Sequence, residues 1–307
     1  MAGGRGVLAV VVTHERCELL REALRRVLAQ EAPCDVLVVD NASADGTAEM
    51  VASEFGGDPR VTYFDTGANL GGAGGFHLGM YWAATAGYDH AWVMDDDSQP
   101  EPGALGALLA AGGSLGDWGF LSSAVYWTDG SPCEANRPKR DLFRHVGDAA
   151  YAAGEPVRVR MGSFVSMLVP TAVIREVGLP LAEYFIWTDD YEFSGRVSKR
   201  HPCWFVPASR VTHAMAANTR ADIATADGER AARFRMLYRN DVHCYRQHGL
   251  EGRAYLAAKA AHAAASVLLR SEGGRAARLS ALVAGYADGM RFQPEPIIPR
   301  DGGGGVA

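Results

Sequence analysis

Short apolar runs alternate with longer amphipathic stretches over the first hundred residues, and this alternation constrains the fold more than any other feature. Four aliphatic or β-branched runs are predicted strands, at residues 7–12, 35–40, 61–64 and 91–94. The segments between them are predicted helices, at residues 17–30 and 47–55, and a third that a glycine-rich loop at 69–75 opens and that runs to about residue 86. Continuous apolar runs are typical of strands that are buried on both faces of a parallel sheet. The pattern predicts an α/β fold in which helices cover both faces of a mostly parallel sheet.

Strand signals continue more weakly in the second half and stop after His213. We expect strands at residues 119–126, 161–169 and 204–207, a loop at 128–154, and helices at 102–109, 171–177 and 191–199. Beyond them, Ala- and Arg-rich helices are predicted at 220–248, 251–270 and 276–289. The chain therefore divides into an α/β domain at 1–215, a helical region at 216–293 and a predicted disordered tail at 294–307.

Composition and charge exclude some classes of partner. The net charge of -6 gives no reason to expect a nucleic-acid partner. The charge is uneven, because residues 216–300 carry 13 Lys and Arg against 8 Asp and Glu. This basic part could face phosphates, contact an anionic membrane surface, pack a homo-oligomer or be a solvated helical face. Five cysteines without CxxC spacing, and an N-terminus without a basic-then-apolar signal pattern, predict a cytoplasmic protein with reduced thiols.

Three consecutive acids, Asp95, Asp96 and Asp97, directly follow the fourth predicted strand. Adjacent carboxylates repel one another, so such a cluster at the mouth of a buried strand costs stability unless a cation offsets it. Carboxylate oxygens are hard ligands that suit Mg²⁺ or Mn²⁺, and Mg²⁺ often binds one or two carboxylates together with substrate phosphates. The cluster predicts a divalent-metal site that holds a diphosphate. A solvated acidic turn is the alternative.

Other polar residues also stand at the carboxyl ends of the predicted strands. Thr13 ends the first strand, Asp40 ends the second, and Asn69 opens a glycine-rich loop after the third. Ligands of open parallel sheets bind at this edge, so we expect these residues to lie near the acid cluster. Helix capping at Asp40 and a tight turn at the glycines are the alternatives.

Two common nucleotide-binding motifs are missing from the sequence. A dinucleotide-binding domain needs GxGxxG directly after the first strand, where this chain has Thr13-His14-Glu15-Arg16. The later run Gly72-Ala73-Gly74-Gly75-Phe76-His77 has His at the position of the last glycine. The P-loop pattern GxxxxGK[ST] does not occur. We therefore reject both a dinucleotide-binding domain and a P-loop nucleotide-binding domain.

Four motifs follow one another in a specific order: Asp40-Asn41, Asn69-Leu70-Gly71-Gly72, Asp95-Asp96-Asp97 and Trp187-Thr188-Asp189-Asp190-Tyr191-Glu192. His213 lies 23 residues beyond Asp190. In these motifs the chain resembles the family 2 glycosyltransferases of the GT-A fold. Within that family it is most similar to bacterial galactofuranosyltransferases and their rhamnosyltransferase relatives. The resemblance covers roughly residues 5–215, which would form the catalytic, nucleotide-sugar-binding domain.

The resemblance implies a role for each member of the acid cluster. The first and last acids of a DxD motif hold the metal in this family, which implies Asp95 and Asp97. The middle residue commonly faces the sugar or ribose, so Asp96 is a candidate for donor contact. Relatives use a downstream histidine as a metal ligand, which implies His213; a structural histidine is the alternative. The expected cofactor is Mn²⁺ or Mg²⁺, which would stabilise the departing diphosphate.

The second acidic motif is the candidate for acid–base chemistry. An inverting transfer needs a base that takes the proton from the acceptor hydroxyl. The resemblance implies Asp190, with Asp189 as its rival; both could instead cap the helix that follows. Glu192 is a candidate for orienting the acceptor. Trp187 could stack on an acceptor sugar or be a core aromatic residue.

Residues at the first three strand ends are candidates for holding the nucleotide. Thr13 and Asp40 are expected near the base and ribose. Asn69, Gly71 and Gly72 could bring the backbone close to the donor, which only small residues allow. Arg16 is a further donor-binding candidate.

These expectations combine into an inverting, metal-dependent glycosyltransferase. UDP-galactofuranose is the first expected donor and dTDP-rhamnose the second, and a glycan, a lipid-linked glycan or a small molecule could be the acceptor. A sugar nucleotidyltransferase is a rival, although residues 13–16 lack the Gly- and Arg-rich loop of that class. A non-catalytic nucleotide-sugar-binding protein is another. The expected location is the cytoplasm, with contact to the inner face of the membrane left open.

Overall fold

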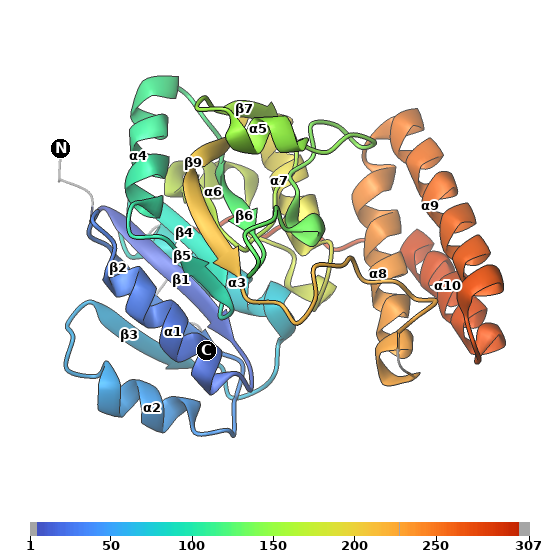
Figure 1. Ribbon diagram of the computed structural model, residues 1–307, viewed down its shortest axis with the longest axis horizontal. Coiled ribbons are helices and arrows are strands. Elements are labelled where there is room, and N and C mark those ends of the chain that lie inside the picture. Colours follow the sequence, from blue (N-terminus) through green and yellow to red (C-terminus); the bar gives the residue numbers. More distant parts are fainter. Residues whose placement is uncertain (1–4, 227, 301–307) are drawn as a thin grey trace.

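The computed structural model describes residues 5–226 and 228–300, in which helices surround a nine-stranded sheet (Figure 1). The strand order is β3-β2-β1-β4-β8-β6-β9-β5, and β7 pairs with β9. The strands are β1 Val7–Thr13, β2 Asp35–Asp40, β3 Val61–Asp65, β4 His90–Asp95, β5 Ser98–Pro100, β6 Leu121–Tyr126, β7 Val157–Val159, β8 Met167–Pro170 and β9 Cys203–His213. The α-helices are α1 Cys17–Leu28, α2 Thr47–Glu54, α3 Gly71–Thr85, α4 Ala104–Leu115, α5 Asp148–Ala152, α6 Thr171–Val177, α7 Asp189–Ser198, α8 Gly228–Arg246, α9 Gly249–Arg270 and α10 Arg275–Arg291.

The first half of the sheet confirms the predicted α/β pattern. Strands β3, β2, β1 and β4 pair in parallel, and every residue of β1 is buried. Alternate side chains of β1 enter two different cores. Val10 and its neighbours on one face pack with α3, whereas Val11 and its neighbours on the other pack with α1, α2 and α4. A strand covered on both faces has no polar side, which explains its continuous apolar run.

The second half of the sheet is mixed. Strand β8 is antiparallel to both β4 and β6, and β9 is parallel to β6 but antiparallel to β5 and β7. The strand expected at 161–169 is wrong before Met167. Residues 161–166 form a loop whose Phe164 and Val165 enter opposite cores, which mimics the apolar run of a strand. A mixed sheet flanked by helices, with a helical C-terminal region, is nevertheless the expected class of fold.

Strand β9 is longer than the sequence predicts, and this length matters for the site. The sequence predicts only a short strand at 204–207, and proline lacks the N–H that a hydrogen bond inside a sheet needs. The chain continues through Pro207 because the register between β6 and β9 shifts from Ser123 opposite Val206 to Ala124 opposite Arg210. The proline falls within this bulge, where no ladder hydrogen bond is lost. Strand β9 therefore runs on to His213.

The C-terminal helices α8, α9 and α10 pack together beside the α/β part (Figure 1). Among the described residues, no helix is both long enough and apolar enough to cross a membrane. The five cysteines are free thiols. Within the tail predicted to be disordered, Ile297 contacts the fold, since its carbonyl oxygen accepts from the backbone N–H of Leu179 at 2.9 Å. Residues 301–307 lie outside the described part of the chain.

Candidate active site

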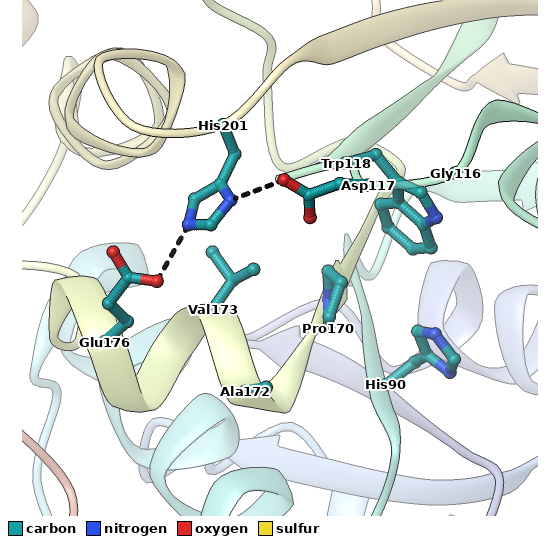
Figure 2. Close-up of a pocket in the computed structure, with 9 residues that line it drawn as sticks. All are labelled: His90, Gly116, Asp117, Trp118, Pro170, Ala172, Val173, Glu176 and His201. Atoms are coloured by element: carbon teal, nitrogen blue, oxygen red, sulfur yellow. Dashed lines mark hydrogen bonds and ion pairs between the residues drawn. The ribbon is translucent and has the colours of Figure 1, made fainter.

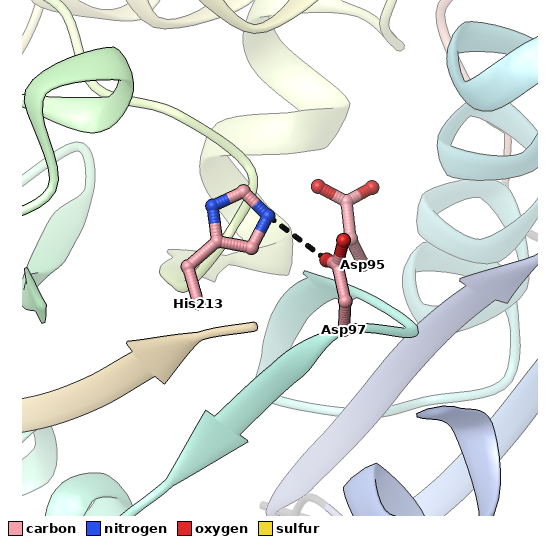
Figure 3. Close-up of side chains that lie close together, drawn as sticks. All are labelled: Asp95, Asp97 and His213. Atoms are coloured by element: carbon pink, nitrogen blue, oxygen red, sulfur yellow. Dashed lines mark ion pairs between the residues drawn. The ribbon is translucent and has the colours of Figure 1, made fainter. Parts of the chain in front are cut away.

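The acid cluster and the predicted histidine meet at the carboxyl edge of the sheet. Strand β4 ends at Asp95, and Asp96 and Asp97 form the turn into β5. The first residue of β5, Ser98, lies opposite His213 at the end of β9. This pairing sets His213 Nε2 at 2.9 Å from Asp97 Oδ1, with the Asp95 carboxylate beside them (Figure 3). One ligand atom from each of Asp95, Asp97 and His213 lies within 4.8 Å of the other two.

Asn136 fixes the orientation of the histidine ring. Its Oδ1 lies 2.9 Å from His213 Nδ1. A side-chain carbonyl only accepts hydrogen bonds, so Nδ1 carries a proton and Nε2 is the atom that faces the acids. Asn136 ends the 3₁₀ helix η1, Glu134–Asn136, inside the stretch that the sequence predicts as a loop. The sequence gives no signal for Asn136, which is 77 residues from its partner.

The pKa values show a site that is short of positive charge. Burial and the charge of Asp97 raise the pKa of Asp95 to about 7. Burial also raises the pKa of Asp96 to about 6, against the opposing charge of Arg16. The pKa of Asp97 is lowered, because the hydrogen bond and charge of His213 outweigh burial. Burial would lower the pKa of His213, but the bond to Asp97 outweighs it and raises that pKa to about 10.

These residues fit a divalent cation. Asp97 Oδ1 is buried and, apart from the imidazole, has no polar partner among the described residues. When the imidazole is neutral, the bond from Nδ1 to Asn136 leaves Nε2 with a free lone pair directed at the carboxylates. Two carboxylates and one imidazole suit Mn²⁺, and the carboxylates also suit Mg²⁺. Asp95, Asp97 and His213 would hold the ion, whose charge would replace that of the histidine proton.

Two predicted donor-binding residues, one at the end of β1 and one just before α1, join the same cluster. Thr13 Oγ1 donates to Asp96 Oδ2 at 2.8 Å. Arg16 Nη1 donates to Asp96 Oδ1 at 3.1 Å and to Asp97 Oδ2 at 2.9 Å. The Arg16 side chain is half exposed, so its guanidinium stands at the open rim of the cluster. A positive group at this rim can offset the acids and also meet an incoming phosphate.

The other predicted donor residues lie at the same edge but in different environments. Asp40 is fully buried, and its oxygens accept hydrogen bonds from Ser43 and from the Tyr63 hydroxyl. Asn69 is exposed and accepts from the backbone N–H of Gly71 at 2.8 Å. Asp40 therefore supports the strand end from inside, whereas Asn69 shapes the entry to α3.

The first two residues of α3, Gly71 and Gly72, differ in their need for glycine. Gly71 has φ +71°, and a Cβ there would lie 2.0 Å from the carbonyl oxygen of Phe185. Both its conformation and this close approach exclude a side chain. Gly72 has neither constraint, since a Cβ there would meet only the Phe76 ring edge at 4.0 Å. Gly71 therefore allows the start of α3, on the donor side of the sheet edge, to pack closely against Phe185 in the loop that precedes α7.

The second acidic pair begins α7, two residues earlier than the helix expected from the sequence. Asp189 is buried and Asp190 is half-buried. Burial raises the pKa of Asp189 to about 6. Burial, followed by the charge of Asp189, raises the pKa of Asp190 well above its ordinary value, and Asp95 contributes to the same shift. The charge of Asp95 thus reaches α7, and Asp189 in turn acts on Asp95.

The two predicted acceptor residues are placed differently. The Trp187 ring is half-buried and packs on Phe234 of α8, with ring centroids 5.2 Å apart. Glu192 is buried and accepts two hydrogen bonds from Arg196, at 3.0 and 2.9 Å. Arg196 also binds backbone carbonyls after α6. The structure therefore gives Glu192 a supporting contact inside the fold and does not bring it to the acid cluster.

A pocket of about 270 Å³ opens at the opposite end of β4 (Figure 2). His90, the first residue of β4, lies on its wall, whereas Asp95 is the last residue of that strand. His201 spans the pocket between Asp117 and Glu176. This pocket contains none of the predicted site residues. The candidate site is therefore the acid cluster, and not this pocket.

Fold and site together define a class of protein. An acid cluster after the central strand of a mixed α/β sheet, with a second acid pair acting on it, is the arrangement that the GT-A resemblance implies. The sequence model of glycosyl transferase family 2 matches residues 8–118, which contain β1 to β4 and all three acids of the cluster.

Curated relatives agree with this class. A galactofuranosyltransferase of Mycolicibacterium smegmatis is 45% identical over 206 residues, which cover 62% of this chain and 65% of that protein. Its counterpart in Mycobacterium tuberculosis is 32% identical over 197 residues, which cover 62% of this chain and 64% of that protein. An N-acetylglucosaminyl-diphospho-decaprenol L-rhamnosyltransferase of Mycobacterium tuberculosis is 28% identical over 228 residues, which cover 64% of this chain and 72% of that protein. The match thus spans slightly less than two thirds of the galactofuranosyltransferases.

Solved structures share the fold at low sequence identity. The mannosyltransferase PcManGT of Pyrobaculum calidifontis, in complex with GDP-Man and Mn²⁺, has a TM-score of 0.57 at 16% identity and covers 94% of this chain and 87% of that chain. Residues 1–349 of TarS from S. aureus have a TM-score of 0.54 at 14% identity, and the match covers 92% of this chain and 70% of that chain. The chain is therefore similar to the family 2 glycosyltransferases over residues 8–118, and it has the GT-A fold.

Proposed function

We propose that this chain is an inverting, metal-dependent glycosyltransferase that moves galactofuranose from UDP-galactofuranose to an acceptor hydroxyl. One observation carries the proposal. Asp95, Asp97 and His213 converge at the carboxyl edge of the sheet, and the Asp189–Asp190 pair acts electrostatically on the same cluster. The choice of donor is supported by 45% identity to a galactofuranosyltransferase over 206 residues.

The acid cluster supplies the leaving-group side of the reaction. A divalent cation held by Asp95, Asp97 and His213 would act as a Lewis acid for the negative charge that develops on the departing diphosphate. Arg16 stands beside this position and can donate hydrogen bonds to a phosphate oxygen. To do so, it exchanges its contact with Asp97 for one with the donor. Thr13 and Asp96 remain bonded to each other and orient the sugar or ribose.

The acid pair of α7 supplies the acceptor side. In an inverting transfer the acceptor oxygen bonds to the anomeric carbon as the bond from that carbon to the diphosphate breaks. Asp190 takes the proton of the acceptor hydroxyl. The nucleoside diphosphate leaves with the electron pair of the bond that breaks at the anomeric carbon. A base works best when its pKa lies near the working pH, and burial moves the pKa of Asp190 in that direction. Asp189 keeps that pKa raised by its charge.

A related proposal concerns the second donor and the acceptor. The relative at 28% identity transfers rhamnose, according to its name, so dTDP-rhamnose is the second candidate donor. Its name also includes a diphospho-decaprenol acceptor, and a further relative of 30% identity is an undecaprenyl-phosphate mannosyltransferase. A lipid-linked glycan is therefore the acceptor class that we propose. The enzyme would then work in the cytoplasm, at the inner face of the membrane.

A donor screen tests the proposal. The full chain is incubated with UDP-galactofuranose, dTDP-rhamnose and other UDP- and dTDP-sugars, with Mn²⁺, with Mg²⁺ or with EDTA, and released nucleoside diphosphate is measured. We expect turnover of UDP-galactofuranose that requires the metal. Release of pyrophosphate from a nucleoside triphosphate would instead identify a nucleotidyltransferase. Binding of nucleotide sugars without any turnover, even with lipid-linked acceptors, would identify a non-catalytic binding protein.

A further inference from the structure

A strained loop of five residues, Tyr184–Thr188, leads from the 3₁₀ helix η2 (Ala182–Tyr184) into α7. Phe185, Trp187 and Thr188 have φ values of 63°, 66° and 68°, although none of them is glycine. At Phe185, ψ is -57°, and the N–H of Ile186 donates to the Tyr184 carbonyl at 2.7 Å. This is a γ-turn with positive φ, which is rare and strained. Such a backbone persists only where its surroundings over-determine it.

Asn240 of α8 makes many of the hydrogen bonds that hold this strained backbone in place. It is fully buried, and its Nδ2 lies within hydrogen-bonding distance of three carbonyl oxygens of the 184–188 loop. The distances are 3.0 Å to Tyr184, 3.0 Å to Ile186 and 2.9 Å to Trp187. Because an amide has two N–H groups, they are shared among three acceptors. One side chain therefore binds the loop along most of its length.

The next residue of α8 binds the last residue of the loop. Thr188 Oγ1 donates to Asp241 Oδ1 at 3.1 Å. The other oxygen of Asp241 pairs with Lys259 Nζ of α9 at 2.6 Å. Asp241 is fully buried, so this pair is held inside the helical region. Thr188 immediately precedes Asp189 and Asp190, and its position fixes where α7 starts.

Of the two other carbonyls of the loop, that of Thr188 accepts from the N–H of Glu192 in α7 at 2.8 Å, and that of Phe185 faces the donor side. The N–H of Ala73, in the first turn of α3, donates to the Phe185 carbonyl at 3.2 Å. The loop is thus held between α3, which begins with the glycine-rich motif, and α8 of the C-terminal helices. Figure 1 shows α8 as the helix of that region that stands nearest to α7.

We infer that Asn240 and Asp241 are positioning residues, which hold the 184–188 loop so that Asp189 and Asp190 face the acid cluster. The C-terminal helices then contribute to the active site, because residues of α8 position the acid pair of α7. This inference rests on the proposed function for its effect on turnover. The hold on the loop itself can be measured without any substrate.

The test uses variants that differ by a few atoms. Asn240→Asp keeps the side-chain shape but replaces both donors with an acceptor that faces three carbonyl oxygens. Thr188→Val removes the hydroxyl that binds Asp241, and Thr188→Ser restores one. Arg235→Gln is the control, because Arg235 also lies on α8 but pairs with Asp288 on the exposed side of the helical region. Each variant is assayed for hydrogen exchange of residues 183–192, for Mn²⁺-dependent UDP binding and for kcat and KM.

We expect faster exchange at residues 183–192 in Asn240→Asp and Thr188→Val, with wild-type exchange in Thr188→Ser and Arg235→Gln. We expect kcat to fall about 10–100-fold in the first two, because a misplaced base loses alignment, while UDP binding and the KM for donor stay within about twofold. If Asn240→Asp does not fold, the Thr188→Val and Thr188→Ser pair decides. Unchanged exchange and kcat in Thr188→Val would overturn the inference. If wild-type protein turns over no donor, the proposed function fails while the exchange data still test the hold on the loop.

Discussion

Asn136 offers the sharpest test of how the metal site is built. Its Oδ1 is 2.9 Å from His213 Nδ1. The nearest alternative partner of that nitrogen is the Cys133 thiol at 4.0 Å, which is too far for a useful acceptor. Asn136→Leu should therefore leave Nδ1 without an acceptor. The neutral ring would then favour a proton on Nε2, where Asp97 accepts it, and this proton competes with a metal.

The expected loss follows from the general role of such outer partners. Removing the group that orients a metal-binding histidine typically lowers metal affinity about 10–100-fold. This range corresponds to about 1.4–2.8 kcal/mol. A buried N–H without an acceptor costs about 1–3 kcal/mol, which is of the same size. We therefore expect Mn²⁺ to bind the Asn136→Leu variant at least about tenfold more weakly than wild-type protein.

Titration calorimetry with Mn²⁺ at neutral pH measures this change directly. Asn136→Asp is the matched variant, because its carboxylate still accepts from Nδ1 and should retain or strengthen binding. Asp97→Ala is the reference for loss of a ligand. The reasoning is refuted if Asn136→Leu binds Mn²⁺ as tightly as wild-type protein while Asp97→Ala loses binding. In that case the metal site exists but does not need Asn136.

Three further predictions concern the base and the start of α3. Asp190→Asn should bind UDP normally and lose about 10²–10⁴-fold in transfer rate, and full activity would remove Asp190 as the base. Because burial raises the pKa of Asp190, the transfer rate should already fall with decreasing pH above the ordinary range of an Asp carboxyl, and the charge of Lys139 opposes this rise in pKa. Lys139→Met should shift that fall to higher pH, and a pH–rate profile that is flat down to pH 5 would contradict both expectations. Gly71→Ala should destabilise the fold in urea by more than the about 1–2 kcal/mol of its positive φ, because the new Cβ meets the Phe185 carbonyl, whereas Gly67→Ala, at the same φ of +71° with no neighbour within 4 Å, should cost only the backbone part.

Local patterns were enough to predict the first half of the fold. Strands β1, β2 and β4 are buried, pair in parallel and have continuous apolar runs, whereas β3 is a partly exposed parallel strand at the edge of the sheet. The helices between them have the periodic apolar spacing that the sequence shows. Parallel strands place their carboxyl ends at one edge, so the sequence predicts that Thr13 and Asp95 lie near each other. The structure confirms this proximity, since Thr13 bonds to the residue after Asp95.

Contacts between distant segments were not predictable in the same way. His213 was expected from a resemblance, but its place beside Asp97 depends on the antiparallel pairing of β5 with β9 and on a bulge at Pro207. No local pattern encodes either feature. Asn136 lies in a stretch without regular periodicity, and only the folded chain brings it to the histidine ring.

The 184–188 loop shows a different limit of sequence reasoning. Positive φ is normally inferred from glycine or asparagine, and this loop contains neither. Its conformation is imposed by Asn240, which is more than fifty residues away in the chain. Trp187 was open to two interpretations, and its contact with Phe234 now places it against the same helix. Strain that is imposed from outside a segment leaves no mark on the sequence of that segment.

The central claim is that the acid edge of the sheet is a metal-dependent site of glycosyl transfer. The most direct test is sugar transfer from UDP-galactofuranose by wild-type protein and by Asp97→Ala, each with Mn²⁺ and with EDTA. We predict that wild-type protein transfers sugar only with the metal, and that Asp97→Ala transfers little in either condition. Transfer by wild-type protein that is equally fast in EDTA, or full metal-dependent transfer by Asp97→Ala, would contradict the account.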